Sequence, residues 1–261
     1  MRTTEVISYI VNWLNEYISQ SGTKGFVVGV SGGIDSAVVS TLAAQTGKNV
    51  LLLEMPIHQP SDQVSRAQEH IKNLTQKFSN VKGKTINLTR SFETLKLDLH
   101  IEEQNKNNDL SLANTRSRLR MTTLYYYAGI NNLLVCGTGN KIEDFGVGFY
   151  TKYGDGGVDI SPIADLLKSQ VFEIAKELGV AESIQQAKPT DGLWVDDRSD
   201  EDQIGATYPE LEWAMSVHKA HKATDFSGRQ KEVFEIYDRL NKLAQHKINP
   251  IPVCTIPKEL L

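Results

Sequence analysis

One short stretch constrains the fold more than any other, the segment "GFVVGVSGGIDSAVVSTLAAQ" at residues 25–45. Its residues 26–30 form a short apolar run, which is typical of a buried strand. From Asp35 onward, apolar residues recur at helical spacing, which predicts a helix with one apolar face. Residues 31–34 must therefore form a tight turn from strand to helix. Such a turn directs unpaired backbone N–H groups and the positive end of a helix dipole at one place, which suits an anion.

Strands and helices alternate along most of the chain. The expected strands lie at 26–30, 49–57, 84–88 and 131–140, and the other expected helices lie at 3–20, 61–78, 90–104, 111–129, 165–178 and 227–245. Such alternation favours a parallel sheet with helices on both faces. The sequence therefore predicts an α/β fold, a doubly wound parallel sheet of the Rossmann-like type, in a single domain that spans residues 1–261.

Two glycine-rich loops follow expected strands, one at 31–34 and one at 137–139. In a doubly wound sheet, ligands bind beyond the carboxyl ends of the strands. Both loops are therefore expected at one shared site. The segment at about 188–212, rich in acidic residues, Gly and Pro, is expected to be a mobile surface loop with short helical turns. It is either a solvated loop or a lid that becomes ordered when substrates bind.

The composition argues against several classes of protein. A hydrophobic content of 40% and a charged content of 23% are typical of a soluble globular chain, and no apolar stretch approaches the length of a membrane span. A net charge of −4 argues against broad nucleic-acid binding. Cys136 and Cys254 form no CxxC pair, which favours a reduced, cytoplasmic setting. Cys136 lies in an apolar run and is expected to be a small buried residue.

Two motif-like stretches fail on their context. "GKT" at 83–85 suggests a P-loop, but Phe78 stands where that motif needs a glycine, and the stretch is expected before a strand rather than after one. "GTGNKI" at 137–142 begins like a dinucleotide fingerprint, yet Ile142 replaces its third glycine. A P-loop NTPase and a dehydrogenase are therefore not favoured.

The turn Ser-Gly-Gly-x-Asp-Ser at 31–36 resembles the pyrophosphate-binding loop of the ATP pyrophosphatases, an adenine nucleotide alpha-hydrolase-like group. The residue types fit that chemistry, because glycines allow close approach to phosphate and serine hydroxyl groups donate hydrogen bonds. The carboxylate of Asp35 would repel phosphate unless it holds Mg²⁺. By analogy with this group, we expect cleavage between the α- and β-phosphates of ATP, with release of pyrophosphate.

Further blocks are similar, in the same order, to the ammonia-dependent NAD synthetase family. They are "NTRSRLRM" (114–121), "GTGNKIEDFGVGFYTKYGDGGVDISPIADLLKSQ" (137–170), "KPTDGLW" (188–194) and "HKINPIP" (246–252). The resemblance spans residues 25–252. It implies a ligase that forms a carbon–nitrogen bond, in which ATP and Mg²⁺ drive the amidation of nicotinic acid adenine dinucleotide (deamido-NAD) by ammonia through an adenylated intermediate. The products are NAD, AMP and pyrophosphate, in the final step of NAD biosynthesis.

The resemblance also assigns roles to single residues. For ATP it implies contacts from Gly29, Val30, Ser31, Gly32, Gly33, Ile34, Asp35, Ser36, Thr138, Lys168 and Thr190. For deamido-NAD it implies contacts from Arg118, Lys152, Asp159, His246 and Lys247. It implies that Asp35 and Glu143 hold Mg²⁺, and that Lys168, at the start of a helix, acts catalytically on the ATP phosphates. Asp155 is expected to orient ammonia and take its proton, or else to cap the turn in which it lies.

The chain departs from the family pattern at one place. Glu143 and Lys152 are separated by one residue more than in the family, and the additional residue is expected within "DFGVG" at 144–148. Asp144 therefore stays an alternative to Glu143 as a metal ligand.

The resemblance further implies a homodimer with the dinucleotide near the interface. Apolar residues of the first helix and of 121–130 are expected to supply that contact. Two competing functions are a tRNA-modifying enzyme of the same superfamily and a non-catalytic nucleotide sensor. The acidic net charge argues against the first, and the presence of Asp35, Glu143, Lys168 and Arg118 argues against the second.

Overall fold

The core of the fold is a parallel sheet. A computed structural model of the chain describes residues 1–101, 105, 107–190 and 199–261. The described residues form a four-stranded sheet in the order β3-β2-β1-β4, and every neighbouring pair of strands is parallel. Its strands are β1 (Gly25–Gly29), β2 (Asn49–Glu54), β3 (Val81–Thr85) and β4 (Leu134–Val135). The predicted α/β fold with a doubly wound parallel sheet is confirmed.

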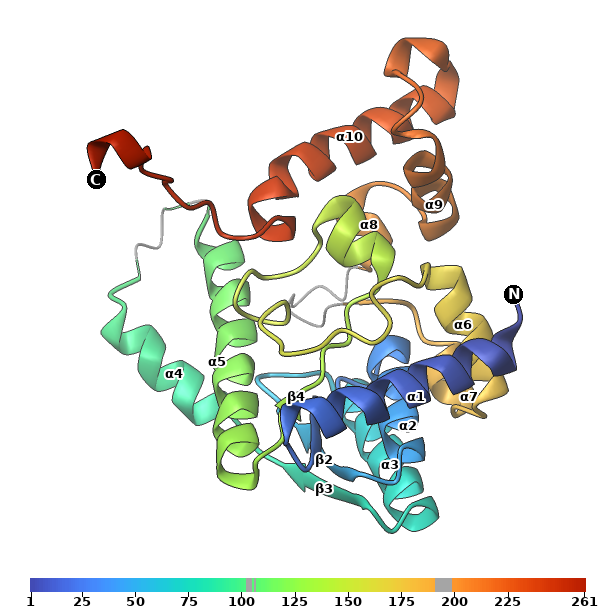
Figure 1. The fold of residues 1–261 in the computed structure, drawn as a ribbon, viewed down its shortest axis with the longest axis vertical. Coiled ribbons are helices and arrows are strands. Elements are labelled where there is room, and N and C mark those ends of the chain that lie inside the picture. The colour runs from blue at the N-terminus through green and yellow to red at the C-terminus, as the bar shows by residue number, and fades with distance from the viewer. Residues whose placement is uncertain (102–104, 106, 191–198) are drawn as a thin grey trace.

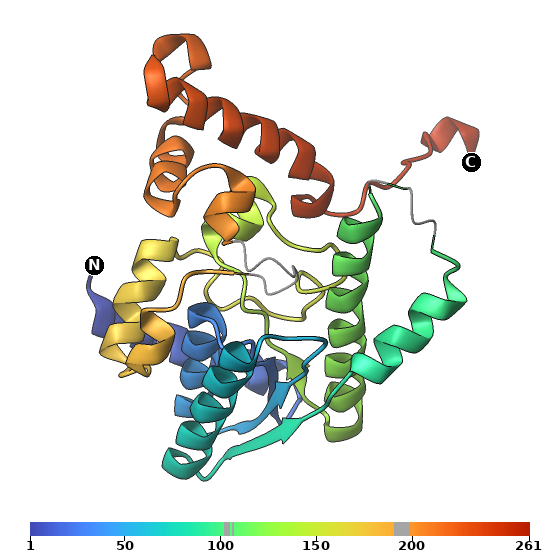
Figure 2. The same ribbon diagram turned by 180° about the vertical axis from the view of Figure 1, so that it is seen from behind.

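Helices surround this sheet (Figures 1 and 2). In chain order they are α1 (Thr3–Ser21), α2 (Ile34–Gln45), α3 (Ser61–Lys77), α4 (Thr89–Asp98), α5 (Asn108–Asn131), the π-helix η1 (Lys141–Val147), α6 (Lys168–Glu177), α7 (Glu182–Gln185), α8 (Asp200–Ile204), α9 (Tyr208–Val217), η2 (Ala223–Asp225), α10 (Gly228–Ile248) and η3 (Lys258–Leu260). None of the described helices is long and apolar enough to cross a membrane.

Strand β1 divides the core into two clusters, because successive residues of a strand point to opposite faces. Phe26 and Val28 are buried in the cluster that includes α1, α2 and α6, whereas Val27 is buried in the cluster that includes α5. Helix α2 contacts the sheet as well as α1 and α6, so most of its residues are buried. This position explains its small side chains, since alanine, serine and threonine allow close packing.

A third cluster joins η1 to α9 and α10. Ile142, Leu211 and Tyr237 are buried in it. Both views show α9 and α10 together at one end of the molecule, away from β3 (Figures 1 and 2). Phe149 and Leu167, from the loop between η1 and α6, also pack against this cluster. The helices of the third cluster therefore pack on the loop that follows β4.

The predicted strands differ from the structure in their bounds: β1 is shifted by one residue, β2 ends at Glu54 rather than at 57, and the last two strands differ more. The third strand lies at Val81–Thr85 rather than 84–88, so "GKT" lies inside a strand and not before one. The fourth expected strand shortens to Leu134–Val135, and the next residue, Cys136, forms an isolated parallel bridge with Ile160. Cys136 is buried, and burial raises the pKa of its thiol above the usual range, which agrees with the predicted small buried residue.

The acidic segment at 188–212 is largely helical where the structure describes it. Residues 191–198 lie outside the described residues. Helix α8 begins at Asp200 and α9 at Tyr208, and both Tyr208 and Leu211 are buried. The predicted short helical turns are confirmed at 200–212, but they pack against the core rather than lie on the surface, and the mobility of the segment stays a prediction. The few apolar residues of this segment pack into the third cluster. In the sequence, the surrounding acidic residues obscure this apolar pattern.

A buried histidine links α2 to α3. His70 is 3% exposed, and its Nε2 atom lies 2.8 Å from Oγ of Ser40. Burial lowers the pKa of His70 to about 4. The pKa of an unfolded histidine is about 6.5. Between pH values equal to these two pKa values, the unfolded chain binds a proton at His70 that the folded chain does not. The contribution of His70 to stability is therefore complete above the higher value and is lost as the pH falls toward the lower one.

We expect the free energy of unfolding to fall by roughly 3 kcal/mol, through His70 alone, as the pH is lowered from about 6.5 to about 4. His70→Gln should flatten this part of the profile, whatever its effect on absolute stability. Urea unfolding at several pH values measures the slope. An equally steep slope in His70→Gln would contradict the role of this residue.

Candidate active site

The loop between β1 and α2 forms a small turn lined by hydroxyl groups. Oγ of Ser31 accepts a hydrogen bond from N of Gly33 (3.2 Å), and Oγ of Ser36 donates to the carbonyl oxygen of Gly33 (2.9 Å). Gly32 has a φ of +83°, and a Cβ atom there would lie 2.6 Å from the carbonyl oxygen of Gln63, so this position requires glycine. Helix α2 begins without a side-chain cap. Its first N–H groups are therefore available to an anion.

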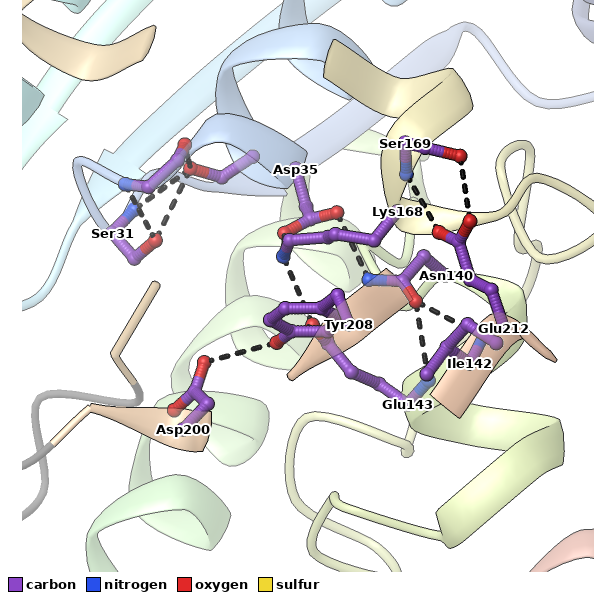
Figure 3. Close-up of polar contacts among 12 residues, drawn as sticks. Ser31, Asp35, Asn140, Ile142, Glu143, Lys168, Ser169, Asp200, Tyr208 and Glu212 are labelled. Atoms are coloured by element: carbon purple, nitrogen blue, oxygen red, sulfur yellow. Dashed lines mark hydrogen bonds and ion pairs between the residues drawn. The ribbon is translucent and has the colours of Figure 1, made fainter. Parts of the chain in front are cut away.

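The sheet order places the loops after β1 and β4 side by side. Strand β1 pairs with β2 on one side and β4 on the other, which is the position where ligands bind in doubly wound folds. The buried side chain of Asn140 connects the two loops (Figure 3). Its Nδ2 donates to Oδ1 of Asp35 (3.1 Å), and its Oδ1 accepts from N of Ile142 and N of Glu143 (3.1 Å each). One amide therefore orients Asp35 and caps the helix that carries Glu143.

Lys168 is the buried cation of the site. It is the first residue of α6 and is 2% exposed. Its Nζ lies 2.5 Å from Oδ2 of Asp35 and 2.9 Å from Oε1 of Glu143 (Figure 3). Burial alone would lower the pKa of Lys168, but the two carboxylates outweigh burial and raise it above its usual range. Lys168 therefore stays charged and balances part of their negative charge.

The two carboxylates differ in their surroundings. Burial raises the pKa of Asp35, with Lys168 opposing this shift and Glu143 reinforcing it. Burial would also raise the pKa of Glu143, but the charge of Lys168 and a hydrogen bond from Tyr208 outweigh it, and the pKa is lowered. The pKa values of the two carboxyl groups are therefore shifted in opposite directions.

The donor set fits the predicted Mg²⁺. Two carboxylates contact one ammonium group, so their oxygens converge on a single small volume. Mg²⁺ is usually held by one or two carboxylates together with substrate phosphates and water. Within the described ranges, no group of three or more His, Cys, Asp or Glu side chains is arranged to hold a metal ion. The pair Asp35 and Glu143 is thus suited to a metal ion that arrives with a phosphate ligand.

A π-helix lies where the sequence comparison predicts an additional residue between Glu143 and Lys152. Helix η1 spans Lys141–Val147, and the N–H group of Gly148 donates to the carbonyl oxygen of Glu143. A π turn holds one residue more than an α turn. Such a turn has room for the predicted additional residue, and Glu143 contacts Lys168 from it.

The neighbouring carboxylate, Asp144, lies elsewhere in the site. A Cβ atom on Gly139 would lie only 1.9 Å from Oδ2 of Asp144, so this carboxyl group packs directly on the second glycine-rich loop. Burial, followed by the charges of Glu143 and Asp155, raises its pKa well above the usual range, with Lys247 opposing. The ion pair to the buried lysine is made by Glu143 and not by Asp144.

A cavity of about 540 Å³ joins most of the predicted residues, a size typical of small-molecule sites. Its wall includes Gly29, Val30, Ser31, Gly32, Gly33, Ile34, Asp35, Ser36, Thr138, Glu143, Asp155, Lys168, Thr190 and Lys247. Four residues predicted for deamido-NAD do not line this cavity, namely Arg118, Lys152, Asp159 and His246. The structure therefore brings together the predicted ATP and metal residues, but only part of the predicted dinucleotide residues.

Asp155 both caps its own turn and lines the cavity. Its Oδ1 accepts hydrogen bonds from Oγ of Ser117 (2.6 Å) and from N of Thr151 (3.0 Å). Desolvation within the cavity raises the pKa of Asp155, with the hydrogen bond from Ser117 opposing. A carboxylate with a raised pKa is a better proton acceptor than an ordinary one. Asp155 can therefore both stabilise its turn and accept a proton.

Arg118, Lys152 and Lys247 form a basic surface beside the cavity. Arg118 donates from Nε and Nη2 to the carbonyl oxygen of Lys152 (3.3 and 3.2 Å), and Nζ of Lys152 donates to the carbonyl oxygen of His246. Lys247 donates to two backbone carbonyl oxygens of the loop after η1 (2.7 and 2.6 Å). Among the described residues, none of these three cations forms an ion pair with a carboxylate. Their charge is therefore available to an anionic ligand.

Asp159 has a different environment. Its Oδ2 accepts a hydrogen bond from N of Val135 (2.8 Å), and its Oδ1 accepts one from the hydroxyl group of Tyr125 (3.0 Å). Desolvation and the neighbouring Asp159 raise the pKa of Tyr125 to about 12, so this hydroxyl group remains a donor. In the single chain, Asp159 thus connects β4 to α5.

Sequence patterns missed five residues of the site. Asn140 connects the two loops, and Arg66 and Arg120 line the cavity, where they donate to the carbonyl oxygens of Gly32 (3.4 Å) and Met55 (3.0 Å). Arg120 lies in the block "NTRSRLRM", whose arginines are a signal that was available in the sequence.

The other two are Tyr208 and Asp200, which lie in the segment expected to be a loop. Each of their helices begins with a capping box, Ser199 with Asp202 and Thr207 with Glu210. Such pairs mark helix starts and could have revealed both elements.

Comparisons with known proteins identify the family of this chain. A family model described as NAD synthase matches residues 6–250. The chain is 36% identical over 250 residues to the NH₃-dependent NAD⁺ synthetase of Mesoplasma florum, with 95% of this chain and 96% of that protein covered. The chain belongs to the NAD synthase family.

Solved structures of other proteins have the same fold as this chain. NMN synthetase from Francisella tularensis is 32% identical, with a TM-score of 0.85 and 99% of both chains covered. The NH₃-dependent NAD synthetase of Campylobacter jejuni shares the fold, with a TM-score of 0.77, 24% identity, and 98% of this chain and 100% of that chain covered. As predicted, this NAD synthase family member is a ligase that forms a carbon–nitrogen bond. Its NH₃-dependent relatives support the ATP-dependent amidation of deamido-NAD.

The contact between Gly139 and Asp144 gives a test of the site geometry. Gly139→Ala should lower the free energy of unfolding by about 1–3 kcal/mol, because its Cβ atom collides with the carboxyl group. In an Asp144→Ala background the same change should cost far less. Gly129→Ala is the matched control, because a Cβ atom there meets no heavy atom within 4 Å. Thermal unfolding measures all four variants, and equal costs in both backgrounds would contradict this packing.

Proposed function

We propose that the described site adenylates the nicotinate carboxylate of deamido-NAD with ATP and then joins ammonia to it. One observation carries the proposal: Asp35, Glu143 and Lys168 meet beside the turn after β1, in a cavity that Asp155 also lines. Adenylation turns a poor leaving oxygen into AMP, so neutral ammonia can attack the acyl carbon. The new carbon–nitrogen bond forms as the bond to AMP breaks.

ATP lies, in this proposal, with its phosphates at residues 31–36. The backbone N–H groups at the start of α2 and the hydroxyl groups of Ser31 and Ser36 donate to phosphate oxygens. Thr138 and Thr190 supply further hydroxyl contacts from the cavity wall. Once the phosphates enter, the ammonium group of Lys168 turns from the carboxylates to the phosphates. It can do so because the phosphates are anionic, as the carboxylates are.

Asp35 and Glu143 would hold Mg²⁺ in the loaded site. Mg²⁺ there supplies positive charge that offsets the charge developing on the leaving pyrophosphate. Asp155 orients ammonia and accepts the proton that the nitrogen loses on attack, which its raised pKa supports.

The dinucleotide would lie across the basic surface of Arg118, Lys152 and Lys247, together with His246 and Asp159. A guanidinium group suits a diphosphate or a carboxylate, because both accept paired hydrogen bonds. Most of this set lies outside the cavity of the single chain, which supports completion of the site by a second copy.

We therefore propose a homodimer with the dinucleotide near its interface. Helix α5 supplies exposed apolar side chains for the contact, including Tyr126 (62% exposed) and Ile130 (61%). The apolar stripe of α1 cannot do so, because Ile7, Ile10, Leu14 and Ile18 are buried in the chain's own core. We also propose a cytoplasmic location, which the absence of any CxxC pair supports.

A second candidate substrate is nicotinic acid mononucleotide, whose amide is NMN. The similarity to NMN synthetase from Francisella tularensis over 99% of both chains favours it. The cavity also agrees with a smaller substrate, because it excludes Arg118, Lys152 and His246. In this alternative, ATP and Asp155 keep their roles, and only the binding of the second nucleotide is lost.

The proposal is tested by product analysis with purified protein, ATP, Mg²⁺, ammonium and equal amounts of deamido-NAD and nicotinic acid mononucleotide. We expect NAD, AMP and pyrophosphate in equal amounts, with deamido-NAD consumed first. Substrate labelled with ¹⁸O in its carboxylate should transfer one labelled oxygen to AMP. Preferential formation of NMN would favour the second candidate, and ADP with phosphate in place of AMP would contradict adenylation.

Asp155→Asn should slow the amidation step and leave adenylation intact, because asparagine keeps the shape of the turn but accepts no proton. Adenylated deamido-NAD should accumulate in a rapid-quench time course with pyrophosphate already released. Asp165→Asn, at a carboxylate that is 95% exposed, is the matched control and should behave like the wild type. Normal NAD formation by Asp155→Asn would leave Asp155 as a turn residue only.

A further inference from the structure

Tyr208 is the first residue of α9 and contacts the central ion pairs from the side of the third cluster. It is 5% exposed, and its hydroxyl group donates to Oε1 of Glu143 at 2.6 Å. The same hydroxyl group lies 3.3 Å from Oδ2 of Asp200, the first residue of α8 (Figure 3). Nζ of Lys168 lies 4.9 Å from the centroid of the tyrosine ring. Tyr208 therefore touches three charged residues at once.

The position of Tyr208 is held from several directions. Thr207 and Glu210 form a capping box around it, and its backbone N donates to Oε1 of Glu201 (2.8 Å). Its ring packs in the third cluster with Leu211. A hydroxyl group fixed in this way can orient a partner, because it has little freedom to follow that partner's movement.

Two donors end on the same oxygen of Glu143. Lys168 and Tyr208 both contact Oε1, at 2.9 and 2.6 Å. A phenolic hydroxyl group carries one proton, so it cannot donate fully to Glu143 and Asp200 together. The hydroxyl group donates its proton to Glu143, because that contact is the shorter one. Its contact with Asp200 is the weaker of the two. The orientation of Glu143 is thus linked to Asp200, which also lines the cavity.

We propose that Tyr208 is a positioning residue for the ATP-dependent half of the reaction, holding the Glu143 carboxylate in the orientation that receives Mg²⁺ with ATP. This inference rests on the proposed metal role of Glu143. Once phosphates draw Lys168 away, Tyr208 is the contact that still restrains Oε1 of Glu143. Without the hydroxyl group, the carboxylate must be ordered by the metal ion itself, which weakens binding.

Tyr208→Phe tests the inference, because phenylalanine keeps the ring and its packing and removes only the hydroxyl group. We expect the KM for ATP and the Mg²⁺ concentration at half-maximal rate to rise about tenfold, as for loss of a hydrogen bond to a charged group. The KM values for deamido-NAD and ammonium should change less than about twofold, since those sites lack this contact. Calorimetric titration with ATP should show the same loss of affinity when Mg²⁺ is present.

Tyr237→Phe is the matched control. Tyr237 is 3% exposed in the same cluster, and its hydroxyl group makes no hydrogen bond within the described part of the chain. It should leave every KM value and the Mg²⁺ dependence unchanged. In a Glu143→Gln background, Tyr208→Phe should not weaken ATP binding further, because the carboxylate that it positions is gone.

Three results would overturn the inference. One is a Tyr208→Phe enzyme with wild-type dependence on ATP and Mg²⁺. Another is a uniform loss of kcat with lowered thermal stability and unchanged KM values, which a purely structural role produces. The third is an undiminished effect of Tyr208→Phe in the Glu143→Gln background. If the wild-type protein forms no NAD, the proposed function fails, but the calorimetric comparison still decides the role of Tyr208.

Discussion

The site depends on one buried ammonium group between two carboxylates. Lys168 is almost fully buried, and such a charge is stable there only because Asp35 and Glu143 lie 2.5 and 2.9 Å from its Nζ. Removing one member of a buried ion pair typically costs about 3–5 kcal/mol, because it leaves a charge without compensation. The same arrangement is ready for chemistry. In the proposed loaded site, the metal ion replaces the ammonium group beside the carboxylates, and the phosphates replace the carboxylates beside the lysine.

The fold brings these three charges together from distant parts of the chain. Asp35 follows β1, Glu143 follows β4, and Lys168 begins α6, so their meeting requires β1 and β4 to be neighbours in the sheet. Asn140 fixes the relative position of the two loops by bonding to Asp35 and to the start of η1. The third cluster then packs α9 against η1. The turn after β1, the two carboxylates and Lys168 are therefore joined by one connected set of contacts that reaches α9.

Much of this site could be predicted from the sequence, because short strands that end in glycine-rich loops specify a doubly wound sheet and its ligand edge. Asp35 follows from that pattern, whereas the roles of Glu143 and Lys168 were implied by the family resemblance. Tyr208 and Asp200 were not predicted, because their helices are short and acidic and become buried only through tertiary packing. The π-helix was also missed, since a single π turn leaves no periodic signal in the sequence. The contact between Asp144 and Gly139 was equally hidden, because it forms only in the folded chain.

The most direct measurement of the central claim is the crystal structure of the protein with Mn²⁺ and a non-hydrolysable ATP analogue, with the metal ion located by its anomalous scattering. We expect one Mn²⁺ bound by oxygens of Asp35, Glu143 and the phosphates, with Nζ of Lys168 moved from the carboxylates to the phosphates. Mn²⁺ bound by Asp144 in place of Glu143, or Lys168 still paired with both carboxylates in the loaded site, would contradict the central claim.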